Sequence, residues 1–368
     1  SGVFLADSNT YKLTPVLLDD LMSRRLYANI HSLNFTGGEI RGQVIPECQY
    51  VMFGFFSGMQ ENKPVQSTAK GNVITEVSGT RLTVTGYVER LLDKVNPNIG
   101  SHLHRAPTGT NGPIRIPLSM TFPTADSLSL IYPASTNTYS VTPAFLDSLK
   151  KRLIYANVHT RRVASGEARA QLNHEALAYY FTNFSGASEN PPVNTKGSGS
   201  LFAEYTGGGT KNITVHGSFN GLEGKFNSAI AGGAHIHGGL SGTNGGIRQG
   251  LAVALAADSL SGVFLAENNV YNIGDGGLDS LRKRLFYANV HTTKVASGEI
   301  RGNFLALANA YFTANLNSRN EVPPNSGSGA GAVKAELLGD RLTVTGSFAN
   351  LTGNFNRDVA GGAHLHNG

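Results

Sequence analysis

Short stretches in which hydrophobic and polar residues alternate recur along the chain. In residues 81–86, leucine and valine alternate with threonine, which predicts a half-buried β-strand. Aromatic stretches at 50–55 and 179–184 predict further strands. Turns are predicted where proline or Asn-Gly pairs interrupt this pattern, at residues 61–65, 109–112, 189–193 and 242–245. Many short strands separated by regular turns predict an all-β protein built as β-sandwiches.

Three stretches predict short helices instead. The first two begin at Thr14 and Thr142 and run through residues 26 and 153, with threonine as the N-cap and proline at the first helical position. In the third copy Asp275 is expected to be the cap. Each helix ends in basic residues that complement the helix dipole and are expected to face water, with a polyanion site as the alternative. These residues are Arg24, Arg25, Lys150, Lys151, Arg152, Arg282, Lys283 and Arg284.

Two motifs repeat along the chain with a period of about 130 residues. The His-x-His motif occurs at residues 102–104, 235–237 and 364–366, and a Tyr-Ala-Asn-Ile/Val-His motif occurs at 27–31, 155–159 and 287–291. The period predicts tandem β-sandwich modules, each with one short helix. The predicted segments are 1–45, the C-terminal half of a module; 46–175 and 176–307, two complete modules; and 308–368, the N-terminal half of a module.

Composition narrows the function classes. Charged residues make up 15% of the 368 residues, below the roughly 25% of an average soluble domain. The net charge of +5 is modest and the basic residues form no long run, so no nucleic-acid partner is expected. No stretch reaches the roughly 20 apolar residues of a membrane-spanning helix, and one cysteine excludes an intramolecular disulfide. Four sequons favour an extracellular location and are candidate glycosylation sites, at Asn34, Asn183, Asn212 and Asn350.

The recurring motifs together resemble the CHRD domain, a repeat first described in chordin. The resemblance rests on the aromatic opening strand, Glu-Asn-x-Pro-Val, His-x-His-Gly, Gly-Thr-Asn-Gly, and Tyr-Ala-Asn-Val-His followed by Gly-Glu-Ile-Arg-Gly, and it covers essentially the whole chain. It implies an extracellular, all-β module without a single established activity. In chordin these domains accompany cysteine-rich growth-factor-binding repeats, which this sequence lacks.

Nine of the eleven histidines fall in the two repeated motifs. In a strand, His-x-His places both imidazoles on one face, and a third imidazole would complete a site that suits Zn or Cu and leaves one coordination position open. The candidate sets are His102, His104 and His159; His235, His237 and His291; and His364 and His366 with His31. Glu39, Glu167 and Glu299 are expected to orient a ring nitrogen or to bind the ion themselves. The alternative is a hydrogen-bonded polar layer without metal.

No nucleophile with an adjacent base recurs across the modules, so no enzymatic activity is expected. Because the sequence starts and stops inside modules, we expect an extracellular structural or interaction protein in which copies complete each other's split modules head to tail, as a filament or matrix. Closure of the two ends within one chain and a fragment of a longer array are alternatives for the architecture. A Cu/Zn-binding protein and a growth-factor-like ligand-binding module are alternatives for the function.

Overall fold

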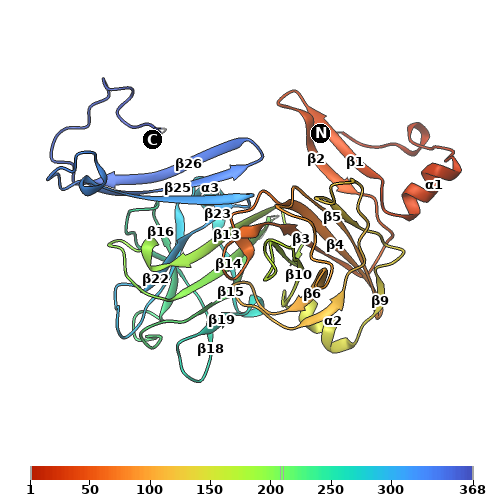
Figure 1. Ribbon diagram of the computed structural model, residues 1–368, viewed down its shortest axis with the longest axis horizontal. Coiled ribbons are helices and arrows are strands. Elements are labelled where there is room, and N and C mark those ends of the chain that lie inside the picture. Colours follow the sequence, from red (N-terminus) through yellow and green to blue (C-terminus); the bar gives the residue numbers. More distant parts are fainter. Residues whose placement is uncertain (1, 208, 210, 367–368) are drawn as a thin grey trace.

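The computed structural model describes residues 2–207, 209 and 211–366, so the predicted segment limits at 1 and 368 lie outside the described residues. We call 2–45 the N-segment, 46–175 module A, 176–307 module B and 308–366 the C-segment. Figure 1 shows the two modules side by side, with the N-segment and the C-segment along one side of them. Over the described residues the protein is all-β with three short helices, as the sequence predicts.

Module A is a sandwich of two antiparallel sheets. The first has the order β12-β3-β4-β5-β8, formed by β12 (Asn173–His174), β3 (Tyr50–Phe56), β4 (Lys70–Ser78), β5 (Arg81–Glu89) and β8 (Leu130–Tyr132), with β9 (Thr138–Ser140) also paired to β5. The second has the order β11-β10-β6-β7, formed by β11 (Ala168–Gln171), β10 (Ile154–Val158), β6 (Ser101–Arg105) and β7 (Ile114–Pro117). Helix α2 (Pro143–Lys150) precedes β10. The alternating residues point inward, and Leu82, Val84 and Leu103 are fully buried between the sheets.

Module B repeats this arrangement. Its first group of strands comprises β13 (Ala178–Ser185), β14 (Ser198–Gly207), β15 (Asn212–Asn220), β18 (Ala254–Leu255), β19 (Gly262–Phe264), β20 (Val270–Asn272) and β23 (Leu305–Ala306). Its second group comprises β16 (Ala234–Gly238), β17 (Ile247–Gly250), β21 (Phe286–Val290) and β22 (Ile300–Asn303). Helix α3 (Gly274–Arg282) precedes β21. One register pair, Ser185 with Arg301, joins β13 to β22, and Ser57 with Arg169 makes the same bridge in module A. In each module the two groups of strands are therefore connected by backbone pairing at one edge.

The N-segment and the C-segment each hold a different part of this module. The N-segment has α1 (Pro15–Met22) and the hairpin of β1 (Tyr27–Ser32) and β2 (Phe35–Gln43), which correspond to α2, β10 and β11. The C-segment has the sheet β24 (Ala310–Asn317), β25 (Ala330–Leu338) and β26 (Arg341–Ala349), which corresponds to β3, β4 and β5. Short 3-10 turns lie at Ala6–Ser8, Gly58–Gln60, Gly186–Ser188, Ala266–Asn268 and Ser318–Asn320.

Two of the three helices begin with the N-cap residue that the sequence predicts. The hydroxyl oxygens of Thr14 and Thr142 accept hydrogen bonds from the third backbone N–H of their helices, both at 3.2 Å, which confirms the predicted caps. The prediction for Asp275 is wrong. The cap residue of α3 is Ile273, and Asp275 lies in the first turn, where its carboxylate pairs with Lys211.

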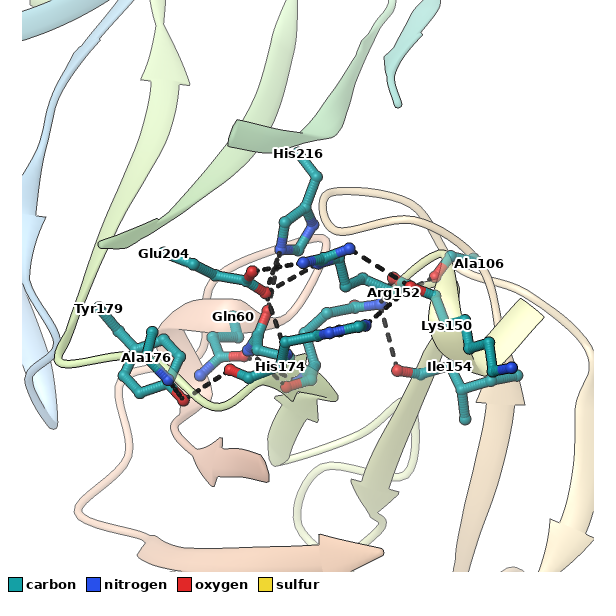
Figure 2. Close-up of polar contacts among 12 residues, drawn as sticks. Gln60, Ala106, Lys150, Arg152, Ile154, His174, Ala176, Tyr179, Glu204 and His216 are labelled. Carbon is teal, nitrogen blue, oxygen red and sulfur yellow. Dashed lines mark hydrogen bonds and ion pairs between the residues drawn. The ribbon is translucent and has the colours of Figure 1, made fainter. Parts of the chain in front are cut away.

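Glu204 of β14 is the centre of the junction between modules A and B (Figure 2). Arg152, which follows α2 in a left-handed conformation with φ of 57°, donates from Nε and Nη2 to the two carboxylate oxygens at 2.9 and 2.7 Å. The backbone N–H of His174 donates to Oε1 at 3.1 Å. The Nε2 of His216 lies 2.9 Å from Asn173 Oδ1 and 3.6 Å from Glu204 Oε1. Burial alone would raise the pKa of Glu204, but His216 and Arg152 lower it to about 2.

The same ion pair recurs at both other junctions. Arg24 pairs with Glu76 and Arg284 with Glu336, at 3.0 and 2.7 Å, with the same separation of 52 residues along the chain. The arginine at each helix end therefore binds the following module, so the prediction that these arginines face water is wrong. The repeated motifs assign no role to His174 and His216, and both lie in the junction of modules A and B. In the sequence, the feature that could have indicated these junctions is the recurrence of Glu76, Glu204 and Glu336 with the period of the repeat.

Candidate metal centre

Strand β6 of module A places two imidazoles on one face. His102 and His104 point away from the core, while Leu103 between them is fully buried in it. Strand β10 pairs with β6 and ends next to His159, so the third imidazole arrives from the neighbouring strand. The ring centroids lie 5.6, 5.5 and 5.9 Å apart. The three residues are buried, and one nitrogen from each lies within 4.8 Å of the others.

Hydrogen bonds from behind orient the rings of this trio. His104 Nδ1 lies 3.0 Å from the carbonyl of Gly112, and His159 Nδ1 lies 2.9 Å from that of Ala164. Because a carbonyl only accepts, each Nδ1 carries the proton and each Nε2 keeps its lone pair. Both Nε2 atoms and the Nδ1 of His102 are buried without a hydrogen-bond partner. A buried nitrogen without a partner is costly, and three converging ones form a donor set for a metal ion.

Module B reproduces this arrangement of ring nitrogens. His237 Nδ1 and His291 Nδ1 lie 2.9 Å from the carbonyls of Gly245 and Ala296, and His235 Nε2 lies 2.6 Å from that of Ala231. The buried nitrogens without a partner are again one Nδ1 and two Nε2 atoms, from His235, His237 and His291 respectively. Their ligand atoms also lie within 4.8 Å of one another. The arrangement is therefore a property of the module and not of one copy.

A buried aromatic and cationic stack supports each trio. The ring of Tyr155 stacks on His104 with centroids 4.9 Å apart, and the guanidinium carbon of Arg169 lies 3.6 Å from the Tyr155 centroid. Arg169 is fully buried and donates to the carbonyls of Pro107 and Thr110 at 2.9 and 2.7 Å. These bonds hold the loop that carries the Gly112 carbonyl, and through it the orientation of His104. Tyr287 and Arg301 form the same stack on His237.

Burial keeps these imidazoles neutral. It lowers the pKa of His104 from 6.5 to about 4, and it also lowers the pKa of His102, His159, His237 and His291. Neutral imidazole is the form that binds a metal ion, so these five imidazoles are in the binding form at neutral pH.

The glutamates have a different role from the predicted one. Glu167 accepts hydrogen bonds from Ser67 Oγ at 2.7 Å, from the Leu92 backbone N–H at 2.9 Å and from Thr160 Oγ1 at 2.8 Å. Glu299 accepts the corresponding bonds from Thr195, Thr292 and the backbone of Glu223 and Gly224. These carboxylates join the two sheets, while backbone carbonyls orient the imidazoles. Glu39, in the N-segment, is exposed.

Another carboxylate lies near each trio and was interpreted in the sequence only as part of a turn. Glu61 is buried, and its Oε2 lies 3.4 Å from the Nδ2 of Asn157, which pairs across the strands with His102. Burial raises the pKa of Glu61 to about 7, and that of its counterpart Glu189 likewise. Gly166, with φ of 124°, is required here, because a Cβ would lie 2.7 Å from Asn157 and 2.8 Å from Glu61.

The third predicted set does not come together within one chain. Among the described residues only the two trios of modules A and B converge. His31 is exposed in the N-segment, and His364 and His366 are exposed in the C-segment, with their ring centroids 4.5 Å apart.

The candidate glycosylation sites differ in accessibility. Asn34 is exposed in the turn between β1 and β2, Asn350 is exposed directly after β26, and Asn212 is half-buried at the start of β15. Asn183 accepts from Ser200 Oγ at 2.7 Å and donates to the Met59 carbonyl at 3.3 Å across the junction of modules A and B. Its amide is thus engaged between modules, and glycosylation at the four asparagines stays a prediction.

Comparisons with known proteins give one match. The CHRD domain family model matches residues 2–44, 55–172, 180–304 and 312–368. No curated protein and no solved structure is detectably similar to the chain. Among the described residues, no helix has the length and hydrophobicity needed to cross a bilayer.

Proposed function

The chain belongs to the CHRD domain family, and from this premise we propose that it is an extracellular structural protein without catalytic activity, whose copies join head to tail. In each joint, the C-segment of one copy and the N-segment of the next form a module that lacks only the counterparts of β17, β18 and the loops beside them. The observation that carries the proposal is that the two segments expose complementary faces that are buried in modules A and B. Such a joint repeated from copy to copy builds a filament or matrix.

The C-segment exposes the face of its sheet that would line a core. Leu342 is 46% exposed, whereas its counterpart Leu82 in module A is fully buried. Val344 and Phe348 on the same face are also exposed, and their counterparts Val84 and Val88 are fully buried. A contiguous apolar face of this kind indicates a binding surface.

A groove of about 580 Å³ lies next to this face, at the position that a strand occupies in the complete modules. It is lined by Gly329 and Leu351, among other residues of the C-segment. In module B the counterpart of Gly329 is Gly197, where a Cβ would lie 2.9 Å from Ile300 and 3.2 Å from Glu299, so β22 occupies that place. The strand of the N-segment that corresponds to β22 is β2.

The N-segment presents its hairpin in the form that modules A and B use. Tyr27 pairs with Gln43 and Asn29 with Arg41, in the same register as the corresponding pairs of β10 with β11. Ile40 of β2 is 64% exposed, although its counterpart Ile300 in module B is fully buried. The hairpin therefore has the shape of a bound strand pair but lacks the sheet that covers it.

The contacts between modules are already made within the chain. Arg24 joins the N-segment to module A, and Arg284 joins module B to the C-segment, through the ion pairs described above. The surfaces that remain without a partner are the apolar faces of the N-segment and the C-segment, whose counterparts in modules A and B pack against each other within one module. Because the two open surfaces differ, the joint is heterologous, and a heterologous contact that does not close into a ring continues into a filament.

Metal binding is a second candidate function, and it rests on a separate observation. Each complete module holds three buried imidazole nitrogens without a partner, oriented by backbone carbonyls. Three nitrogen ligands and no thiolate suit Zn²⁺ or Cu²⁺. This proposal does not depend on the joint, because each of the two trios lies within one module.

Two variants test the joint. We expect Ile40→Asp to inactivate the N-segment face and Leu342→Asp the C-segment face, so that each variant alone is monomeric in light scattering. Mixed together they retain one active face of each kind and form dimers that do not extend. Leu33→Asp is the matched control, because Leu33 is exposed and its counterpart Arg161 is exposed in module A. Wild-type protein that remains a monomer, with its N-segment folded onto its own C-segment, contradicts the proposal.

A further inference from the structure

We infer that the joint between copies is itself a metal site, in which His364 and His366 of one copy and His31 of the next hold one ion. The inference rests on the proposed head-to-tail assembly. It adds a ligand that only the assembled form binds, and thereby a means of controlling assembly.

His31 already has the orientation of a ligand. Its Nδ1 lies 2.8 Å from the carbonyl of Thr36, five residues later in the sequence. His159 and His291 make the same bond to Ala164 and Ala296, with the same five-residue separation. In all three the proton is thus on Nδ1 and the Nε2 lone pair is free. The hairpin sets this geometry locally, without the rest of the module.

The second half of the site lies in a segment that lacks its partner strand. Residues 363–366 have no strand structure, although their counterparts form β6 and β16. In module A, β6 pairs with β10 through Tyr155 with His104 and Asn157 with His102. The corresponding pairs across the joint are Tyr27 with His366 and Asn29 with His364. Addition of this strand supplies main-chain hydrogen bonds and fixes the register.

The side chains agree with this register. Leu365, between the two histidines, is 72% exposed, and in the paired strand it takes the core position of Leu103. Tyr27 already has the guanidinium carbon of Arg41 3.4 Å from its ring centroid, as Tyr155 has that of Arg169. The N-segment therefore already contains the tyrosine and arginine stack that supports His104 in module A, and in the joint this stack would support His366. In this register the joint brings together the imidazoles of His364, His366 and His31, as modules A and B each bring together three.

Metal and assembly are coupled because this site takes ligands from two chains. An ion that binds only the joined form lowers the protein concentration needed for half-assembly, by about 100-fold when the free ion is at 100 times its Kd. The trios of modules A and B take all their ligands from one chain, so their occupancy does not shift the joint. Three imidazoles and no carboxylate favour Zn²⁺ or Cu²⁺ over Ca²⁺ or Mg²⁺.

Zinc alone is a sufficient probe. We expect assembled wild-type protein to contain one Zn²⁺ per chain more than the monomeric Ile40→Asp variant, measured by elemental analysis after removal of free ion. His31→Gln removes this additional ion and abolishes the effect of zinc on the half-assembly concentration. His102→Gln is the control, because it removes one ion from module A and leaves the response of assembly to zinc unchanged.

The possible results separate the two proposals. Filaments with no additional zinc, or with an additional zinc that persists in His31→Gln, overturn the inference and leave the assembly proposal standing. Absence of filaments at every zinc concentration overturns the assembly proposal itself. Both proposals are supported if a chelator dissociates the wild-type filaments and dissociates those of His102→Gln in the same way.

Discussion

The complete modules and the two partial segments carry the same motifs in opposite environments. Leu103 lies between two histidines and is fully buried, whereas Leu365 lies between two histidines and is largely exposed. Nevertheless, β1 and β2 keep the register of β10 and β11, and His31 keeps the carbonyl bond of His159. Hairpins and ring orientation are therefore local properties of the sequence. Burial of the apolar faces, strand formation at residues 363–366 and the assembled trio require the other half of the module.

The largest effect that this comparison predicts is at the leucine between the histidines. Leu103→Asp buries a carboxylate in the core of module A and is expected to cost about 5 kcal/mol of unfolding free energy. Leu365→Asp is expected to leave the stability of the monomer unchanged and to abolish assembly. Thermal unfolding and light scattering of the two variants measure both effects. Equal destabilisation of the monomer by both variants would show that the C-segment already has a closed core.

The arginine and glutamate pairs at the junctions provide the next test. Glu204→Gln leaves the guanidinium of Arg152 without its ionic partner and is expected to cost about 4 kcal/mol at the junction of modules A and B. Glu336→Gln is expected to have a similar effect on the C-segment, because the exposures of the two ion pairs are alike. Hydrogen exchange of β14 and β25 measures the two losses separately. A small effect at Glu336 alone would mean that the C-segment is held mainly by other contacts.

A smaller effect is expected from pH in the complete modules. The pKa of His104 falls from 6.5 to about 4 on folding, so the unfolded chain binds more protons than the folded one between these values. Its contribution to stability is complete above pH 6.5 and is lost as the pH falls toward 4, by on the order of 3 kcal/mol. Metal-free wild type and His104→Gln, compared by denaturant titration at pH 7 and pH 4.5, measure it. A pH dependence that is the same in both would assign the loss to other groups.

The smallest predicted effect is the same in a partial segment and in a complete module. Thr14→Ala and Thr142→Ala each remove a helix cap with the same geometry, and each is expected to cost about 1 kcal/mol. Hydrogen exchange of α1 and α2 measures the two costs. Equal values support the interpretation that capping is local, and a much smaller value for Thr14 would show that α1 frays without its module.

The sequence by itself determined the repeat, the all-β class, two of the three helix caps and the two histidine trios. The reason is that a strand alternates its side chains between two faces, so His102 and His104 share a face once residues 101–105 form a strand. Only the tertiary structure decided which group orients each ring. The folded loops bring the carbonyl of Gly112 to His104, and they direct the carboxylate of Glu167 to Ser67 instead of to an imidazole. The tertiary structure also decided the bond between Arg152 and Glu204, which joins residues 52 positions apart in different modules. Such contacts depend on how whole modules meet, so the recurrence of Glu204 with the repeat marks the residue but does not identify Arg152 as its partner.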